Sequence, residues 1–308
     1  MSPIRFATRS AAEVSFNSQT MRLSLGTVQF GLPYGIASKA PVLPDDDIRE
    51  ILDFAFRQGI QTLDTAPAYG DIECRLSSLC EGFEFRIVSK IPPLPVELDD
   101  EAAAQWAVNS ARTSQTRLGN KLCALLFHRA EDLLGSRGDA VSKAVGQWAT
   151  TQGVSIGASG YDAGVVRLLF EMHRISVAQL PGNALDQRID RVLEKIEPKP
   201  ELFLRSAFLQ GLLLLPIEDA VRRVPAAKFA LQQWSQWLTN RGMSPIHGAL
   251  SIVRAFSDVA SCVVGVDNKS HLEEIMDEWQ IVKPISAREL SCSDLQTIDP
   301  RLWGVLKQ

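Results

Sequence analysis

Short apolar segments alternate with amphipathic segments eight times along most of this chain. The apolar segments have the length of strands, and the amphipathic ones have the period of about 3.6 residues that is typical of helices. Strands that alternate with helices form parallel sheets, because each helix returns the chain to the same edge. The expected strands cover residues 23–27, 61–63, 85–89, 123–127, 154–158, 177–180, 202–204 and 260–264.

Eight strand-helix units predict an α/β fold, a closed (β/α)₈ TIM barrel of eight parallel strands. The expected helices cover residues 46–58, 72–79, 101–117, 140–150, 163–172, 189–196, 226–239 with 245–256, and 271–278. The alternative is an open doubly wound sheet, but no Gly-x-Gly-x-x-Gly fingerprint follows the first strand. A chain of 308 residues could hold two domains. No linker divides this one, so we predict one barrel domain over residues 21–308 with a C-terminal tail.

Charge and composition exclude several classes of function. A net charge of −4 and a pI near 5.7 provide no basic surface for a nucleic acid. The longest apolar stretch, residues 208–217, is too short to span a membrane and contains Gln210 and Pro216. The five cysteines are scattered without metal-ligand spacing, so we expect no metal site and a reducing, cytoplasmic location.

Polar residues follow three successive predicted strands. Asp64 and Tyr69 lie on the loop after the second strand, Lys90 ends the third and His128 ends the fourth. In α/β proteins, the carboxyl ends of the strands carry the functional residues. If these strands are neighbours in a barrel, the four side chains converge on one rim.

These four residue types suit the reduction of a carbonyl group. The carbonyl oxygen gains negative charge as hydride arrives, and a Tyr with an ordinary pKa near ~10 is protonated and ready to donate there. A Lys ammonium lowers the pKa of a nearby phenol, an Asp balances a buried Lys, and a His orients the oxygen. Each residue alone has an ordinary explanation, as a rim aromatic, a loop histidine or a solvated strand end. The four types in order argue against that explanation.

The motifs of the chain extend this pattern. They are Leu25-Gly26-Thr27 with Phe30-Gly31, Asp64-Thr65-Ala66 with Tyr69-Gly70, Val88-Ser89-Lys90, Leu126-Phe127-His128, Ile156-Gly157-Ala158-Ser159, and Gln179. In this order the chain resembles the aldo-keto reductase family over residues 23–274. The resemblance implies a (β/α)₈ barrel in which Tyr69 is the proton donor. It also implies that Lys90 activates Tyr69, Asp64 pairs with Lys90, and His128 orients the carbonyl.

The resemblance also implies a nicotinamide dinucleotide that is bound across the barrel mouth without a Rossmann unit. Ser159 and Gln179 match the residues that bind the carboxamide. The remaining residues implied at the cofactor are Gly26, Thr27, Arg205, Ser206, Gly211, Gly265, Lys269 and Ser270. Ser206 and Gly211 match the loop whose backbone amides meet the pyrophosphate.

Two positions depart from the family pattern. Gly160 stands where an Asn is usual, which removes one carboxamide contact unless Asn183 replaces it. Arg205 stands where an aromatic residue usually stacks on the nicotinamide. Its guanidinium plane could stack there, bind an acidic substrate or a phosphate, or form a surface ion pair.

The choice of nucleotide depends on the loop after the eighth strand. The family prefers NADP(H) because basic residues there bind the 2′-phosphate. Asp267 and His271 stand where basic residues are common, and a carboxylate favours a 2′-hydroxyl instead. Lys269 and Ser270 retain some preference for phosphate. We therefore expect use of both cofactors, with NADP(H) favoured and NAD(H) possible.

Together these features predict an NAD(P)H-dependent oxidoreductase that reduces an aldehyde or a ketone. The stretch from Arg205 to Gly211 resembles that of bacterial members associated with surface-sugar synthesis, which suggests a sugar-derived carbonyl. Two other functions stay open: a non-catalytic nicotinamide-binding regulatory subunit, and a barrel isomerase or lyase that uses Lys90 as a Schiff-base nucleophile. The expected partner is a small carbonyl substrate, and the expected state is a monomer or small homo-oligomer.

The two ends of the chain give weaker expectations. Residues 1–20 are rich in Ser and Thr and have no apolar segment typical of a secretory signal. They would form an N-terminal arm, or a hairpin that closes the barrel floor as in many family members. Tyr34 in the first loop and Trp303 in the tail would line the substrate pocket.

Overall fold

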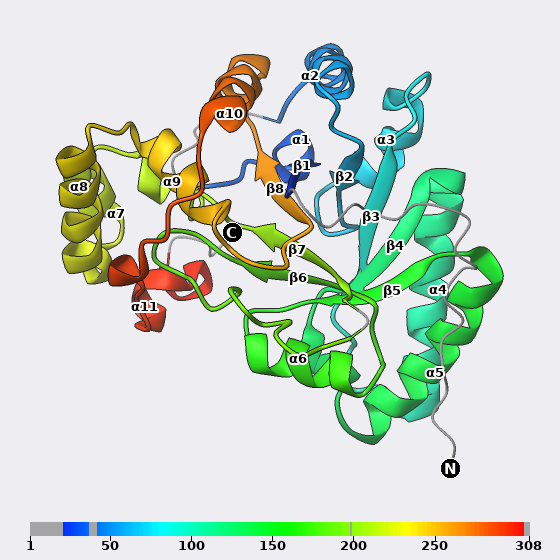
Figure 1. Cartoon of the computed structure of the whole chain (residues 1–308). Helices are drawn as coiled ribbons and strands as arrows, with labels where there is room; N and C mark the ends of the chain where they lie inside the picture. Colours follow the sequence, from blue (N-terminus) through cyan, green and yellow to red (C-terminus); the bar gives the residue numbers. More distant parts are fainter. Residues whose placement is uncertain (1–20, 37–41, 198, 305–308) are drawn as a thin grey trace.

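The computed structural model describes residues 21–36, 42–197 and 199–304. Eight parallel strands pair in sequence order, and β8 pairs with β1 to close the barrel. Figure 1 shows the helices arranged around these strands. The predicted barrel is confirmed, and the open-sheet alternative is wrong. The strands are β1 (Arg22–Gly26), β2 (Thr62–Asp64), β3 (Arg86–Ile91), β4 (Leu122–Phe127), β5 (Ser155–Ser159), β6 (Val177–Pro181), β7 (Glu201–Arg205) and β8 (Ser261–Gly265).

The helices agree with the predicted segments at most positions. The α-helices are α1 (Val28–Gly31), α2 (Asp45–Arg57), α3 (Ile72–Leu79), α4 (Asp100–Leu118), α5 (Gly135–Gln152), α6 (Ala163–Glu171), α7 (Ile217–Arg223), α8 (Lys228–Arg241), α9 (Pro245–Val253), α10 (Lys269–Ile281) and α11 (Leu295–Ile298). Short 3₁₀ helices are η1 (Gly119–Lys121), η2 (Ala130–Leu133), η3 (Leu212–Leu214), η4 (Pro225–Ala227), η5 (Arg288–Leu290) and η6 (Pro300–Leu302). Helices α1, α7 and α11 were not predicted.

Polar caps determine where several of these helices begin. The side chains of Asp99, Asp162, Ser244 and Asn268 accept hydrogen bonds from backbone amides in the first turns of α4, α6, α9 and α10. These amides have no partner within the helix, so an oxygen side chain at this position stabilises the helix start.

The predicted helix over residues 189–196 is wrong. The chain between β6 and β7 forms successive turns, in which Val192 N donates to Ile189 O at 3.2 Å and Glu194 N donates to Arg191 O at 2.9 Å. Arg191 and Lys195 have φ of 63° and 67°, which no right-handed helix accommodates. The helix was predicted because the buried residues Ile189, Val192 and Leu193 have the spacing of one helix face.

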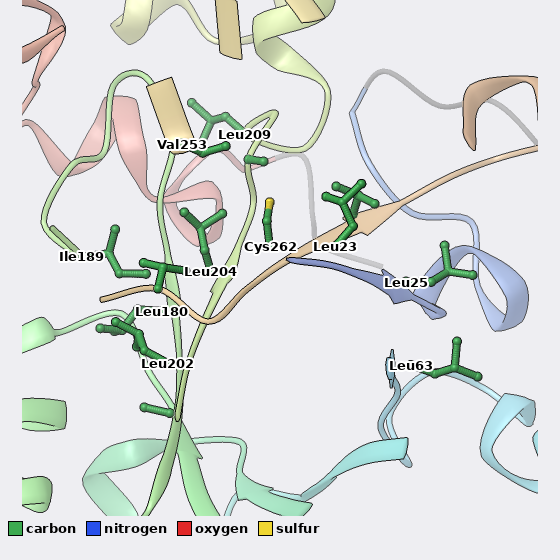
Figure 2. Packing of buried hydrophobic residues seen from close by; sticks show 14 of the residues in the cluster. Leu23, Leu25, Leu63, Leu180, Ile189, Leu202, Leu204, Leu209, Val253 and Cys262 are labelled. Atoms are coloured by element: carbon green, nitrogen blue, oxygen red, sulfur yellow. The ribbon is translucent and has the colours of Figure 1, made fainter. Parts of the chain in front are cut away.

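The strands are apolar on both faces because both faces are buried. One cluster fills the barrel interior and contains Val88, Ala124, Leu126, Val177, Phe203 and Val263. The alternate strand residues point outward and pack under the helices. Figure 2 labels Leu23, Leu25, Leu63, Leu180, Leu202 and Leu204 of this outer cluster, together with Val253 of α9. The two-sided burial explains why most residues on both faces of the strands are apolar.

Three other expectations concern the chain as a whole. All five cysteines are free thiols. Among the described residues, no helix has the length and apolar character needed to cross a membrane. The predicted arm or hairpin over residues 1–20 lies outside the described residues, so the division into an arm and a barrel domain stays a prediction.

Candidate active site

The strand periodicity brings the predicted site residues to one rim of the barrel. Side chains alternate between the two faces of a strand, so a residue two positions after an interior residue also faces inward. Val88, Leu126, Val177 and Phe203 lie in the interior cluster. Two positions later in the chain stand Lys90, His128, Gln179 and Arg205. They form the top layer of the interior, at the carboxyl ends of β3, β4, β6 and β7.

The ammonium of Lys90 forms a buried ion pair at this layer. Its Nζ donates to Asp64 Oδ1 at 2.7 Å and to the backbone oxygen of Thr65 at 2.9 Å. The side chains of Lys90 and Asp64 are only 1% and 8% exposed. Gln179 Nε2 also donates to Asp64 Oδ1, at 2.8 Å. Burial lowers the pKa of Lys90, and the carboxylate of Asp64 opposes that shift. The pair is therefore compensated by charge and by hydrogen bonds.

Tyr69 lies directly above this ion pair. Lys90 Nζ is 5.2 Å from the centroid of the Tyr69 ring, and the His128 ring meets it edge-on at 6.4 Å between centroids. Burial raises the pKa of the Tyr69 phenol, and the negative charge of Asp64 raises it further. The sequence interpretation expected Lys90 to lower this pKa. In the folded protein burial and the charge of Asp64 outweigh the positive charge of Arg205, which lowers this pKa. The phenol is therefore protonated at neutral pH.

His128 is a neutral imidazole in this environment. Burial lowers its pKa to about 4, and the positive charges of Lys90 and Arg205 contribute to the shift. Its backbone amide donates to Ile91 O at 2.9 Å, which holds the residue against the end of β3. A neutral imidazole carries one N–H that can donate to a ligand oxygen and cannot compete with Tyr69 as a cationic acid.

Two glycines allow the loop of Tyr69 to follow its path. A Cβ on Gly31 would lie 1.9 Å from the backbone oxygen of Tyr69. Gly70 has φ of 66°, and a Cβ there would lie 2.5 Å from the backbone oxygen of Gly31. Only glycine at both positions lets the end of α1 touch this loop. The Phe-Gly and Tyr-Gly pairs in the sequence thus form one contact, which positions Tyr69.

A second buried carboxylate holds the strand that carries Lys90. Glu73 on α3 is 1% exposed and accepts hydrogen bonds from Ser89 at 2.6 Å and Ser114 at 2.8 Å. Arg117 on α4 donates to its other oxygen at 2.8 Å. Ser89 directly precedes Lys90, so this cluster connects β3 to two helices. No sequence motif indicated Glu73.

The expected carboxamide residues form a connected row. Ser159 Oγ lies 3.4 Å from Gln179 Oε1, and Gln179 reaches Asp64 through its amide nitrogen. Asn183 does not replace the side chain missing at Gly160. Its Oδ1 accepts from the amides of Leu185 and Asp186, and its nitrogen donates to Ser206 O. Asn183 therefore shapes its own loop, and Ser159 and Gln179 are the side chains at this end of the site.

Gly26 and Thr27 support the rim from below. Gly26 pairs with Asp64 on one side and with Gly265 on the other. Thr27 is fully buried, and both its amide and its hydroxyl donate to the backbone oxygen of Asp64, at 2.9 and 3.1 Å. The hydroxyl of Thr27 is thus engaged within the protein. Thr27 positions Asp64 instead of presenting a hydrogen-bonding group to the mouth.

Arg205 turns toward the loop after β5. Its Nη2 donates to Gly160 O at 3.0 Å, and its guanidinium carbon lies 4.2 Å from the centroid of the Tyr161 ring. Arg301 from the C-terminal tail contacts the same ring at 3.7 Å. Among the described residues, no carboxylate lies within ion-pair distance of Arg205. Within the described part of the chain, Arg205 is therefore not a surface ion-pair partner.

The loop after β7 has an unusual backbone. Ser206, Leu209 and Gln210 have φ of 63°, 48° and 55°, and Gly211 follows at 86°. Left-handed conformations at non-glycine residues are strained and concentrate at functional sites. The amide of Gly211, expected at the pyrophosphate, donates instead to Phe208 O at 2.9 Å within the loop. Gln210 Nε2 donates to the Tyr34 hydroxyl at 3.2 Å, and burial raises the pKa of Tyr34 to about 12.

The loop after β8 is arranged around Asn268 and Lys269. Asn268 accepts from the amide of His271 and caps α10, so Ser270 is an exposed residue in the first turn. Lys269 Nζ donates to Glu50 of α2 at 2.8 Å and lies 3.8 Å from Glu273. Gly265 has little space above its Cα, since a Cβ would lie 2.4 Å from Gln29 Oε1. Lys269 is therefore already paired within the protein.

A dinucleotide fits the polar groups of this rim. Gln29 Oε1, Thr65 Oγ1 and Gln210 Oε1 are buried and have no hydrogen-bond partner in the described part of the chain. Gln29 lies in α1 directly after β1, and Thr65 and Gln210 lie on the loops after β2 and β7. Buried polar atoms normally have partners, and unpaired ones often mark a ligand site. The amide and hydroxyl donors of a nicotinamide dinucleotide could satisfy them.

Sequence reasoning missed several residues of this mouth. Tyr161 stands only two positions after Ser159, and this proximity in the sequence could have indicated that it lies beside the site. Arg301 gave no signal, because it is 140 positions from Tyr161 in the chain. The tail was expected to reach the pocket through Trp303. In the structure Arg301 makes the contact, while the Trp303 ring nitrogen donates to Gln296 O.

Comparison with known proteins places this geometry among solved structures. No protein-family model matches the sequence, and no curated protein matches it. Solved structures do match. A protein of Pseudomonas aeruginosa described as a candidate aldo-keto reductase is 23% identical, with a TM-score of 0.60 over 86% of this chain and 92% of its own. The holo form of an aldo-keto reductase from Bacillus halodurans is 15% identical, with a TM-score of 0.66 over 88% and 90%.

A third match is glycerol dehydrogenase from Gluconobacter oxydans, which is 18% identical, with a TM-score of 0.65 over 88% of this chain and 89% of its own. These identities are low, so the likeness concerns the fold. The match extends over nearly the whole length of each protein. This chain has the barrel fold of the solved aldo-keto reductases.

Proposed function

We propose that this protein is an oxidoreductase of the aldo-keto reductase type, which reduces an aldehyde or a ketone with a nicotinamide cofactor. The observation that carries the proposal is the buried Lys90–Asp64 pair directly beneath Tyr69, with neutral His128 beside the phenol. Burying two charges is costly, so an ion pair without a function in the site would not need to be buried as Lys90 and Asp64 are. The barrel likeness to solved aldo-keto reductases supports the same conclusion.

The side chains at the rim divide the proton chemistry among them. The bound cofactor supplies the hydride. The N–H of neutral His128 donates to the carbonyl oxygen and orients it. The phenol of Tyr69 gives its proton to that oxygen as it becomes an alkoxide, a stronger base than a phenolate. The ammonium of Lys90 then stabilises the phenolate, and Asp64 holds the ammonium in place.

The Schiff-base alternative is disfavoured by the surroundings of Lys90. A Schiff-base nucleophile needs an accessible, neutral amine. Lys90 is 1% exposed, and its ammonium donates to both Asp64 and Thr65. A non-catalytic subunit would not need the proton donor and its neighbours, so their presence together favours an enzyme.

The direct test combines binding with turnover. Titration with NADPH and NADH, followed by quenching of Trp fluorescence, measures both affinities. A panel of neutral and charged aldehydes and ketones is then assayed with the preferred cofactor. Binding with turnover supports the proposal. Binding without turnover on any carbonyl would favour the regulatory subunit, and no binding would contradict both.

We expect reduction to be nearly independent of pH between about 5.5 and 9.5. His128 becomes charged only as the pH falls toward its pKa of about 4. The Tyr69 phenol loses its proton only above its ordinary range, because its pKa is raised. Neither group titrates between these limits. A kcat profile with a clear inflection near pH 6.5 or 8 would contradict these pKa directions.

We propose NADP(H) as the favoured cofactor and NAD(H) as usable, with Lys269 at the 2′-phosphate. Lys269 is shared with Glu50, so its contribution is modest. Lys269→Ala should weaken NADPH roughly twofold to fivefold and leave NADH unchanged, as for an exposed ion pair. Glu50→Gln releases Lys269 and should strengthen NADPH alone. Fluorescence titrations measure both variants, and an equal effect on the two cofactors would remove Lys269 from the 2′-phosphate.

We also propose a cellular compartment and a substrate class for this protein. The five free thiols support a reducing compartment such as the cytoplasm. A sugar-derived carbonyl is a candidate substrate, and the aldehyde panel should include sugars. The barrel is proposed as the only domain after residue 20, and the oligomeric state, a monomer or small homo-oligomer, is accessible by light scattering.

A further inference from the structure

The positively charged side chains at the barrel mouth are not all paired with a carboxylate of the described residues. Lys90 is paired with Asp64, and Arg301 is paired with Asp299 through Nε at 2.9 Å and Nη2 at 2.5 Å. Arg205 is the exception. Its hydrogen bonds go to the neutral oxygens of Gly160 and Ser206, and no carboxylate among the described residues pairs with it. A cation next to the reacting groups is therefore left without a counter-charge.

The position of Arg205 relates this charge to the chemistry. It ends β7, on the same interior face as Gln179 and Lys90. Arg205 stands two positions after the interior residue Phe203, as Lys90 and His128 stand two positions after Val88 and Leu126, so the three share one layer of the barrel interior. Its charge lowers the pKa of His128. Lys269, in contrast, stands at the start of α10 and is paired with Glu50 of α2 and with Glu273. An anion on Arg205 would thus lie near the carbonyl group.

The guanidinium of Arg205 is also held in one orientation. Its stacking on Tyr161 at 4.2 Å and its bond to Gly160 O fix the plane of the fork. Arg205 is nevertheless partly exposed, so some of its five donors stay available. A fixed guanidinium fork matches the two oxygens of a carboxylate or a phosphate.

We propose that Arg205 binds an anionic group, a carboxylate or a phosphate, on the carbonyl substrate. This inference rests on the proposed function, since it assigns the substrate class of the same site. The preferred substrate is then an aldehyde or ketone that carries its anion within reach of the carbonyl. Arg205 is a specificity-determining residue, and the proton transfer itself stays with Tyr69.

Two substrate pairs separate the sources of the anion. The first is 4-formylbenzoate against its neutral methyl ester, and the second is glyceraldehyde 3-phosphate against glyceraldehyde. Arg205→Met should lower kcat/KM for an anionic member roughly 10- to 100-fold, the value of a lost charge-assisted hydrogen bond. The decisive quantity is the ratio of kcat/KM for the anionic member to kcat/KM for the neutral member, which should fall roughly 10- to 100-fold in Arg205→Met. Selective loss in the first pair identifies a carboxylate, and in the second a phosphate.

Arg205→Lys keeps the charge but loses the fork, so it should retain an intermediate rate on the anionic member. The affinities for NADPH and NADH are measured on each variant and should be unchanged. If both members of each pair lose equally, or if neither loses, Arg205 does not read a substrate anion. An equal loss with weaker cofactor binding would assign Arg205 to the cofactor and overturn the proposal.

A turnover-independent measurement keeps this proposal distinct from the proposed function. Binding of benzoate and of benzamide is followed by calorimetry with the full chain, wild type and Arg205→Met, in the presence of the oxidised cofactor. Benzoate should bind the wild type and lose affinity in the variant, while benzamide should not discriminate. If the wild type reduces carbonyls but shows no Arg205-dependent preference in either assay, the inference fails and the proposed function stands.

Discussion

Tyr69→Phe is expected to lower kcat for aldehyde reduction roughly 10²–10⁴-fold, the usual contribution of a general acid. The substitution removes only the phenolic hydroxyl, and the ring keeps its contacts with Lys90 and His128. The affinity for NADPH should therefore be preserved. Steady-state assays with a reactive aromatic aldehyde measure kcat, and fluorescence titration measures the cofactor affinity.

Tyr34→Phe provides a matched control for this experiment. Tyr34 is likewise a partly buried phenol, but its hydroxyl accepts a hydrogen bond from Gln210 in the loop after β7. Its removal should change kcat by less than about threefold, since it does not transfer the proton. A Tyr69→Phe enzyme with nearly wild-type kcat would show that another group is the acid.

Lys90→Met is expected to destabilise the fold by about 3–5 kcal/mol, because it leaves the buried carboxylate of Asp64 without its cation. Both side chains are at least 92% buried in the structure, so solvent offers little compensation. Urea unfolding measures the loss. Lys90→Met/Asp64→Asn removes both charges and keeps an acceptor for Gln179, so it should recover much of the stability. Equal instability of the single and double variants would mean that packing, and not charge, explains the loss.

Activity assays distinguish the contribution of this ion pair to stability from its contribution to proton transfer. Neither the single nor the double variant should regain wild-type reduction, because the cation that stabilises the phenolate is absent from both. In the direction of alcohol oxidation, which requires the phenolate, Lys90→Met should move the pH profile to higher pH. A profile that overlays the wild-type curve would remove Lys90 from the proton chemistry.

The sequence was sufficient for the features that depend on local pattern. The eight strands were recognised because each is buried on both faces and therefore mostly apolar. Asp64, Lys90 and His128 were predicted to share a rim because parallel strands in a barrel end on the same side. Both inferences need only the period of a strand and the direction of the chain.

The tertiary structure alone decided the features that depend on distant contacts or on burial. The turns at Arg191 and Lys195 replaced an expected helix, because buried residues with helical spacing also fit a chain of turns. Tyr161 met Arg301 from the far end of the sequence. The pKa of Tyr69 rose where a neighbouring lysine suggested a fall, since desolvation depends on everything packed around the phenol.

Arg205 combines the two kinds of information. The sequence by itself marked Arg205 as an unusual residue at the end of a strand and left three roles open. Among the residues that the structure describes, Arg205 forms no ion pair, and its guanidinium contacts a neutral carbonyl, a hydroxyl and an aromatic ring. Local pattern determines which residues reach the rim. Only the packed fold determines which charges there are balanced, because the counter-charges come from other strands and from the tail.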